Sequence, residues 1–314
     1  MISLKFKRVL ALALSVALLV GTMPTTISAQ VAGGFQALAE VERLLYGNAG
    51  TGAIQPRLER VELDLFGKVQ TGALTIRVQE LARLVLTSDP RQVSILMQLN
   101  SMEWIIYDEI KPEASIIERV AAIERDLYGE ERKELNLGQR LDALLNDIWP
   151  GGSLTVAKGE LTEGAVIQIA LLTKIDSSSM KVGDEVRYVV VESVVRDNKV
   201  LIPAGARGVG RVTNVRPSSR LGRDGHVEVN WGTLRAMDGT EVAVRIGQRA
   251  EERTNSLELA TGAALAGVIL LGPIGLAAGA LVTGQDDIVP VGTQLFVEVA
   301  APVEVNGLSL VPAY

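Results

Sequence analysis

The sequence predicts an α+β protein: an N-terminal α-helical repeat, forming a small solenoid or a bundle, followed by an antiparallel β-barrel or sandwich with an inserted apolar helical hairpin. Three observations predict this fold class. An apolar pattern recurs every 20 or 21 residues over positions 35–150, the chain after position 160 alternates with period two, and the stretch from Thr261 to Gly284 contains no charged residue. The predicted segments are a signal peptide at 1–29, the helical repeat at 30–150, a linker at 151–159 and the β domain at 160–314, with the hairpin at 257–284.

The first residues predict export. Three basic side chains among the first eight residues precede an apolar run from Val9 to Val20, and small residues follow, as in a secretory signal peptide cleaved between Ala29 and Gln30. A signal that stays attached as a membrane anchor is the alternative. Because the sequence has no cysteine, it offers neither a lipidated cysteine nor a disulfide. We therefore expect a protein of the periplasm or one associated with the outer membrane.

The charge balance disfavours one class of partner. Removal of residues 1–29 takes away three basic residues and no acidic one, which leaves 28 Lys and Arg against 37 Asp and Glu and a net charge of −9. Nucleic-acid binding requires a basic surface. The sequence therefore predicts no nucleic-acid partner.

The helical half is built on a repeat. The segment VERLLYGNAGTGAIQPRLE at 41–59 aligns with VELDLFGKVQTGALTIRVQ at 61–79, and a further copy begins with IERDLYGEE at 123. Apolar triplets with i, i+3, i+7 spacing begin at Leu38, Leu58, Val78, Leu99, Val120 and Leu141. Each triplet predicts one helix of about three turns, which is too short to be stable alone, so the helices are expected to pack against one another.

Recurring polar and aromatic residues accompany these helices. The recurring arginines are Arg57, Arg77, Arg119 and Arg140, and the recurring glutamates are Glu42, Glu62, Glu103 and Glu124. Arg57 and Glu62 lie about 140° apart around a helix axis and cannot pair within it, so we expect Arg–Glu bridges between neighbouring helices. The aromatic residue that ends several repeats, as at Tyr46 and Tyr128, is interpreted as core, with an exposed row that binds glycan or peptide as the alternative.

The second half predicts about seven antiparallel strands. Val227, Val229 and Trp231 alternate with polar residues, and the same period marks 242–246 and 295–299. Further strands are expected at 165–173, 184–195, 199–203 and 207–215. Turns are expected at Asp197-Asn198, at Pro203-Ala204-Gly205 and at Asp238-Gly239.

Four stretches of this half resemble, in order, a known family. They are LTEGAVIQIALLTKIDSSS, VRDNKVLIPAGARGVGRV, GRDGHVEVNWGTLRAMDGTEVAV and IVPVGTQLFVEVAAPVEV. Residues of about 160–306 are therefore similar to the C-terminal β-barrel of the outer-membrane channel subunit of type IV secretion and conjugation systems. The resemblance implies that a helical pair interrupts the barrel before its last strand and lines a pore in a ring-shaped oligomer. The N-terminal half departs from the family, because a helical repeat stands where the inner-membrane helix and the proline-rich arm are expected.

The apolar stretch allows three interpretations. One spanning helix would be long enough for a membrane but would separate the strand at 293–300 from its sheet. A hairpin that turns at Gly272-Pro273 returns both ends to one side, and it either enters a membrane or an oligomer or is buried within the protein. The residues expected to contact membrane or another copy are Leu265, Ile269, Leu270, Gly272, Pro273, Gly275 and Gly279.

No catalytic, cofactor or metal site is expected. The single histidine, His226, is interpreted as a surface residue at a strand start, and a chain with one histidine and no cysteine lacks the ligands of a histidine-rich or thiolate zinc site. A local run of positive charge is the other candidate site, where an anionic envelope polymer or lipid headgroup would bind. Its residues are Arg207, Arg211, Arg216, Arg220 and Arg223.

Together these features predict a non-enzymatic protein of the bacterial cell envelope, with a structural, pore or assembly role and no cofactor. Self-association is the expected partnership, with membrane lipid, envelope polymer or other envelope proteins as further partners. Two alternatives stay open: a soluble periplasmic module that binds glycan or peptide, and an envelope hydrolase that uses carboxylates.

Overall fold

The structure is a computed structural model, and it describes residues 25–88, 92–149, 151, 154–218, 224–261 and 288–311. The chain divides into two compact units at the bond between Ala82 and Arg83. None of the described helices combines the length and the apolar composition that a membrane span requires. The predicted signal peptide lies outside the described residues up to position 24, and the predicted cleavage point falls within the first described helix.

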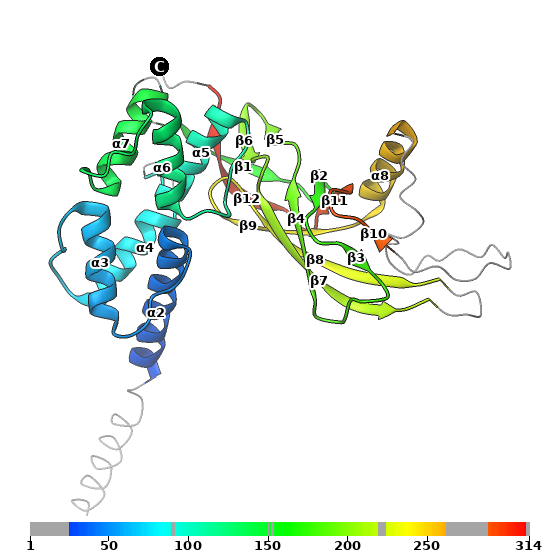
Figure 1. Cartoon of the computed structure of the whole chain (residues 1–314), viewed down its shortest axis with the longest axis horizontal. Coiled ribbons are helices and arrows are strands. Elements are labelled where there is room, and N and C mark those ends of the chain that lie inside the picture. Colours follow the sequence, from blue (N-terminus) through cyan, green and yellow to red (C-terminus); the bar gives the residue numbers. More distant parts are fainter. Residues whose placement is uncertain are drawn as a thin grey trace, which may run out of the picture. The chain divides into compact units, whose positions relative to one another are not determined.

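Six helices lie in the described part of the N-terminal half, as the repeat predicts (Figure 1). They are α2 (Thr25–Tyr46), α3 (Ile54–Phe66), α4 (Leu74–Leu86), α5 (Ile95–Tyr107), α6 (Ile116–Tyr128) and α7 (Leu137–Ile148). Each predicted apolar triplet falls on one helix, and most of its members are fully buried. Gly67 follows α3 in a left-handed backbone conformation, with φ of 70°. Asp108 adopts the same conformation after α5, with φ of 60°, although it is not a glycine.

Twelve strands make up the described part of the C-terminal half. They are β1 (Val156–Leu161), β2 (Val166–Leu171), β3 (Ile175–Asp176), β4 (Glu185–Val190), β5 (Val194–Arg196), β6 (Lys199–Ile202), β7 (Arg207–Arg216), β8 (His226–Arg235), β9 (Glu241–Arg245), β10 (Ile288–Val289), β11 (Gln294–Val299) and β12 (Val303–Ser309). Six of them close an antiparallel barrel in the order β11-β2-β4-β7-β8-β9, which confirms the predicted barrel. A four-stranded sheet, β1-β12-β6-β5, and a two-stranded sheet, β10-β3, complete the domain.

Side chains fill the barrel. Tyr188 of β4 is fully buried, its hydroxyl donates to the carbonyl oxygen of Trp231 at 2.7 Å, and the two rings meet edge to face at 5.8 Å. A Cβ atom on Gly208 of β7 would lie 2.2 Å from the Tyr188 ring, so only glycine leaves room for that ring. Strands of this barrel alternate between buried and exposed positions, which explains why the period of two predicted most of them.

The three helices α5 to α7 belong to the same compact unit as the β domain. Asn100 of α5 donates to the carbonyl oxygen of Met237, and the Trp104 indole donates to Ser193, each at 2.9 Å. In the loop after α5, the backbone amide of Ile110 donates to Ala204 at 2.9 Å. The boundary between the compact units therefore lies at Ala82–Arg83 and not in the predicted linker at 151–159. The reason is that α5 buries side chains on several faces and packs with the β domain.

Candidate functional site

The recurring charges form a series of buried ion pairs. Each recurring arginine donates through Nε and Nη2 to the recurring glutamate of the preceding helix, at 2.5–3.1 Å, which confirms the predicted bridges. The pairs are Arg57–Glu42, Arg77–Glu62, Arg119–Glu103 and Arg140–Glu124.

The same glutamates also hold the loops that follow their helices. Each accepts a hydrogen bond from the backbone amide eight residues further on, as Glu42 does from Gly50 at 2.8 Å and Glu124 from Arg132 at 3.2 Å. Burial raises the pKa of Glu42, but the hydrogen bond from Arg57 and other favourable contacts outweigh that effect, and the net pKa is lowered. The four carboxylates are thus committed to holding neighbouring helices together.

The aromatic residues are engaged rather than free. The hydroxyl of Tyr128 donates to Asp147 of the next helix at 2.6 Å, and the Arg132 guanidinium lies over its ring at 3.6 Å. Burial, followed by the hydrogen bond to Asp147, raises the pKa of Tyr128 to about 12. Tyr46 and Tyr107 make the same two kinds of contact. The rings therefore tie helix to helix while keeping part of their surface in solvent.

Helix α8 (Gln248–Thr261) leads from β9 into the predicted apolar hairpin, and no element was expected over most of its length. Glu298 of β11 is buried with 4% of its surface exposed, and its carboxylate accepts a hydrogen bond from the Ala250 amide at 2.9 Å in the first turn of α8. Thr254, one turn later, accepts a hydrogen bond from the Phe296 amide at 3.1 Å. Two groups of one barrel strand thus fix the helix in place.

The chain returns to the described residues at β10, whose two residues pair with β3. Next to that pairing, Asp176 of β3 accepts hydrogen bonds from the Lys174 ammonium and from the Ser178 amide and hydroxyl, at 2.6, 3.0 and 2.6 Å. These bonds, that from Lys174 first, lower the pKa of Asp176 to about 2. Both flanks of the predicted hairpin are therefore attached to the β domain (Figure 1).

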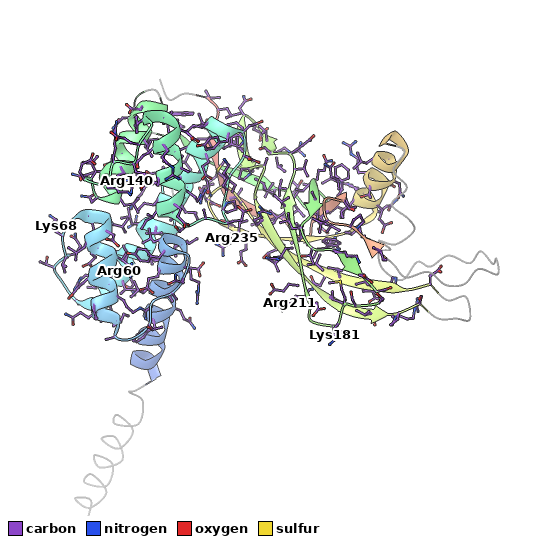
Figure 2. All side chains as sticks on the ribbon, in the orientation of Figure 1. Arg60, Lys68, Arg140, Lys181, Arg211 and Arg235 are labelled. Atoms are coloured by element: carbon purple, nitrogen blue, oxygen red, sulfur yellow. The ribbon has the colours of Figure 1, made fainter. Side chains whose placement is uncertain are left out.

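The predicted hairpin residues themselves, Leu265, Ile269, Leu270, Gly272, Pro273, Gly275 and Gly279, lie outside the described residues. So do Arg220 and Arg223 of the predicted anion site. Of its three described members, Arg216 is the last residue of β7. Arg207 pairs with Glu113, and Arg211 (Figure 2) pairs with Glu185 on the neighbouring strand at 2.9 Å. Burial lowers the pKa of the Arg207 guanidinium. The structure therefore gives these two arginines acidic partners within the protein, and anion binding at this run stays a prediction.

A cleft of about 440 Å³ opens beside the start of α8. Its charged groups contact protein atoms: Arg245 pairs with Glu163 at 2.7 Å, and Arg249 donates to the carbonyl oxygen of Gly164 at 3.3 Å. Across the described ranges, no group of three or more His, Cys, Asp or Glu side chains is arranged to hold a metal ion. His226 lies at the start of β8, where a strand start was predicted, with its Nε2 atom 3.5 Å from the Glu228 carboxylate.

Comparisons with known proteins do not assign the chain to a family. No protein-family model matches it, and no curated protein matches it. Among solved structures it is similar to ComB10 of the Com type IV secretion system of Helicobacter pylori, with 14% sequence identity and a TM-score of 0.27 over 46% of this chain and 88% of that chain. The six-stranded barrel is the fold that the resemblance of residues 160–306 implies. The score is too low to give this chain a function, and the barrel itself is established by the strand pairing described above.

Proposed function

We propose that the protein is a non-enzymatic structural subunit of a bacterial cell-envelope assembly, which uses the apolar stretch at 262–284 for membrane insertion or self-association. The observation that carries the proposal is the position of that stretch within the β domain. It follows α8, which Glu298 fixes to β11, and it precedes β10, which pairs with β3. A segment whose two ends are both attached to one domain is suited to project from that domain toward a membrane or another copy. The sequence resemblance over residues 160–306 supports the same role.

The filled barrel restricts how such a subunit would form a passage. A six-stranded barrel is too narrow for a channel, and here Tyr188 and Trp231 occupy its centre. Any pore would therefore be lined by apolar stretches from several copies and not by the interior of one barrel. This reasoning favours an oligomeric subunit.

The rival functions receive less support from the described side chains. A module that binds glycan through its aromatic row would present free rings, whereas Tyr46 and Tyr128 are held by an aspartate and covered by an arginine. A hydrolase would need a carboxylate free to exchange a proton with its substrate. The most buried glutamates, such as Glu62 and Glu124, instead bind arginine.

The test is an alkaline carbonate wash of membranes from cells that express the full chain. It is compared with a variant in which residues 262–284 are replaced by a short Gly-Ser turn, leaving α8 and β10 in place. A second variant, Ile269→Lys with Leu270→Lys, places two charges in the stretch. Its matched control, Asn255→Lys, puts a charge on an exposed position of α8.

We expect the full chain and the Asn255→Lys control to stay in the membrane pellet, and the two variants of the stretch to be released in a folded form. Circular dichroism of the released protein checks its folding. If the Gly-Ser variant pellets as the full chain does, membrane insertion by the stretch is wrong. If all forms are soluble, monomeric and folded, the structural role itself is wrong and the binding module becomes the better proposal.

A further inference from the structure

The buried ion pairs divide the six described helices of the N-terminal half into two equivalent sets of three. We define module 1 as residues 34–86, with α2 to α4, and module 2 as residues 95–149, with α5 to α7. Glu42 and Arg57 of module 1 correspond to Glu103 and Arg119 of module 2, at offsets of 61 and 62 residues. Each module contains two buried ion pairs in the same order. Equivalent positions of the two modules can therefore be compared within one chain.

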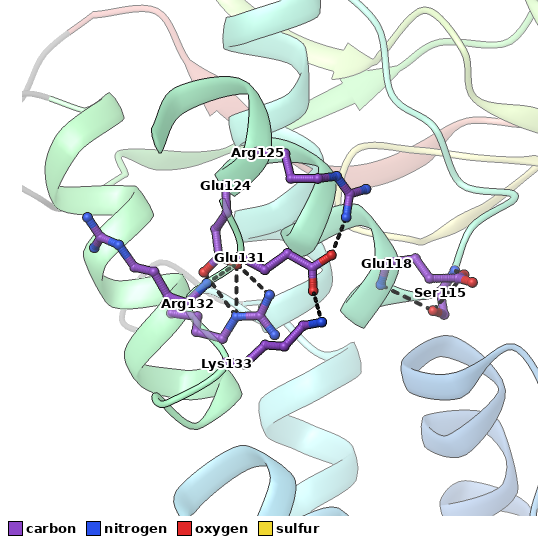
Figure 3. Close-up of polar contacts among 8 residues, drawn as sticks. Ser115, Glu118, Glu124, Arg125, Glu131, Arg132 and Lys133 are labelled. Atoms are coloured by element: carbon purple, nitrogen blue, oxygen red, sulfur yellow. Dashed lines mark hydrogen bonds and ion pairs between the residues drawn. The ribbon is translucent and has the colours of Figure 1, made fainter. Parts of the chain in front are cut away.

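Three equivalent surface positions differ in polarity. Module 2 carries Arg125, Glu131 and Gln139 at these positions. Arg125 forms an ion pair with Glu131 (Figure 3), and Gln139 caps the start of α7. Module 1 carries Leu63, Val69 and Ile76 at these positions. Their exposed fractions are 48%, 41% and 54%. The same scaffold is thus polar in one module and aliphatic in the other.

The three aliphatic residues are the sequence neighbours of one hydrogen-bonded centre. The Glu62 carboxylate accepts from the Gln70 amide at 3.0 Å and from Arg77 at 2.9 and 2.5 Å. Leu63 follows Glu62, Val69 precedes Gln70 and Ile76 precedes Arg77. We call Leu63, Val69 and Ile76 the aliphatic corner of module 1. The Arg125–Glu131 ion pair of module 2 indicates that the equivalent positions of Leu63 and Val69 lie side by side. Exposed aliphatic residues that gather in one patch mark a contact site.

The charges beside the aliphatic corner point to its partner. Lys68 lies in the loop after α3 (Figure 2), next to Val69 in the sequence. Glu80 lies one helical turn after Ile76. Both are exposed, and their charges are opposite. A lipid surface would favour basic residues alone around such a site. Glu59, one helical turn before Leu63, and Arg83, one turn after Glu80, add a further acid and a further base to this surface. A patch that carries charges of both signs is complementary to itself when a two-fold axis brings the acid of one copy opposite the base of another.

We propose that the aliphatic corner is a self-association surface, on which the same corner of a second copy of this chain docks with Lys68 of one copy facing Glu80 of the other. Three aliphatic side chains cover far less than the roughly 1,200 Å² of a stable interface. The contact is therefore weak alone and adds to other subunit contacts through its high local concentration in an assembly. It goes beyond the proposed function and does not depend on whether residues 262–284 enter a membrane.

The test uses site-directed cross-linking, for which a chain without cysteine is a clean background. Two full-length single-cysteine variants, Lys68→Cys and Glu80→Cys, are mixed and treated with a short bismaleimide. The matched control is the equivalent pair in module 2, Glu130→Cys with Ala143→Cys. Different tags on the two partners identify the mixed product on a gel.

We expect the module 1 pair to cross-link at least about tenfold more than the module 2 pair. In the same background, Leu63→Arg with Val69→Glu and Ile76→Gln should reduce the yield to the level of the module 2 pair. These replacements are the residues of module 2 at the same positions, so they suit the scaffold, and circular dichroism checks the fold. Ile76→Gln alone provides the same test if the triple variant is unstable. Equal yields from both modules, or a yield that the substitutions leave unchanged, would overturn the proposal.

Discussion

The buried ion pairs of the helical repeat predict a large loss of stability when one partner is removed. Arg119 and Glu103 have side chains that are 3% and 2% exposed, and Arg119 donates twice to Glu103, at 2.9 and 2.6 Å. Substituting Arg119→Met leaves the Glu103 carboxylate buried with only the Lys111 amide still donating to it, at 2.8 Å. Breaking a buried pair in this way costs about 3–5 kcal/mol.

The magnitude translates into a measurable thermal shift. In a domain of about 150–250 residues, 1 kcal/mol corresponds to about 2–4 °C, so Arg119→Met should lower the Tm of the unit that contains it by about 6–20 °C. The matched control in the same unit is Arg211→Met, because Arg211 also pairs with a glutamate, Glu185, but its side chain is 64% exposed. A surface pair contributes about 0–1 kcal/mol, so this control should change the Tm little.

The double variant Glu103→Leu with Arg119→Met separates the cost of an unpaired charge from the value of the pair. Replacing both charges by apolar groups is often neutral or stabilising, so the double variant should be more stable than Arg119→Met alone. Urea denaturation of all forms, followed by circular dichroism, measures these differences. If Arg119→Met costs less than about 1 kcal/mol, or if the double variant is no more stable than the single one, the assigned role of these pairs is wrong.

Three further predictions concern the β domain, each measured by urea denaturation. Gly205→Ala should destabilise by at least about 1 kcal/mol, because Gly205 has φ of +81° and an added Cβ would lie 2.1 Å from the carbonyl oxygen of Ile110; an effect below this would contradict the close packing of the loop after α5. Gly208→Ala should cost about 1–3 kcal/mol, because its Cβ would meet the Tyr188 ring at 2.2 Å, and an unchanged midpoint would show that the ring has room to move. Asp176→Asn should destabilise the protein above pH 4 and lose this effect as the pH falls toward 2. The pKa of Asp176 is lowered from 3.8 to about 2, and such a carboxylate stabilises the fold only while it stays ionised. A difference in stability that is constant over this pH range would refute the assignment.

Periodicity predicted the elements whose stability comes from a single buried face. Helix α6 and strand β9 each bury one face. The apolar triplet that begins at Val120 lies within α6, and the strand predicted at 242–246 ends within two residues of β9 on both sides. The charge pattern predicted the bridges between helices because an arginine and a glutamate that cannot meet on one helix must meet across two. In these cases the local sequence pattern and the tertiary packing favour the same structure.

Elements stabilised from a distance could not be predicted in this way. Helix α8 is mostly polar and buries little of its surface, and its first turn is held by Glu298, 48 residues further along the chain. Strand β1 fell in the predicted linker, because Gly159 interrupts its pattern where a Cβ would lie 2.4 Å from Leu201. The position of α5 against the β domain had one available signal: its sequence, ILMQLNSMEWIIY, is apolar on more than one face, which indicates burial on two sides.

The repeat also explains where the chain divides. In the series of ion pairs, the step from α4 to α5 would require a glutamate at position 82 and an arginine near position 98, but Ala82 and Gln98 occupy these places. An alanine and a glutamine cannot form an ion pair, and the Gln98 amide instead donates to the carbonyl oxygen of Val93 at 2.9 Å. The boundary between the compact units falls directly after Ala82. Each set of three helices forms its ion pairs within itself. The interruption between α4 and α5 therefore leaves no buried charge of the series without a partner on either side.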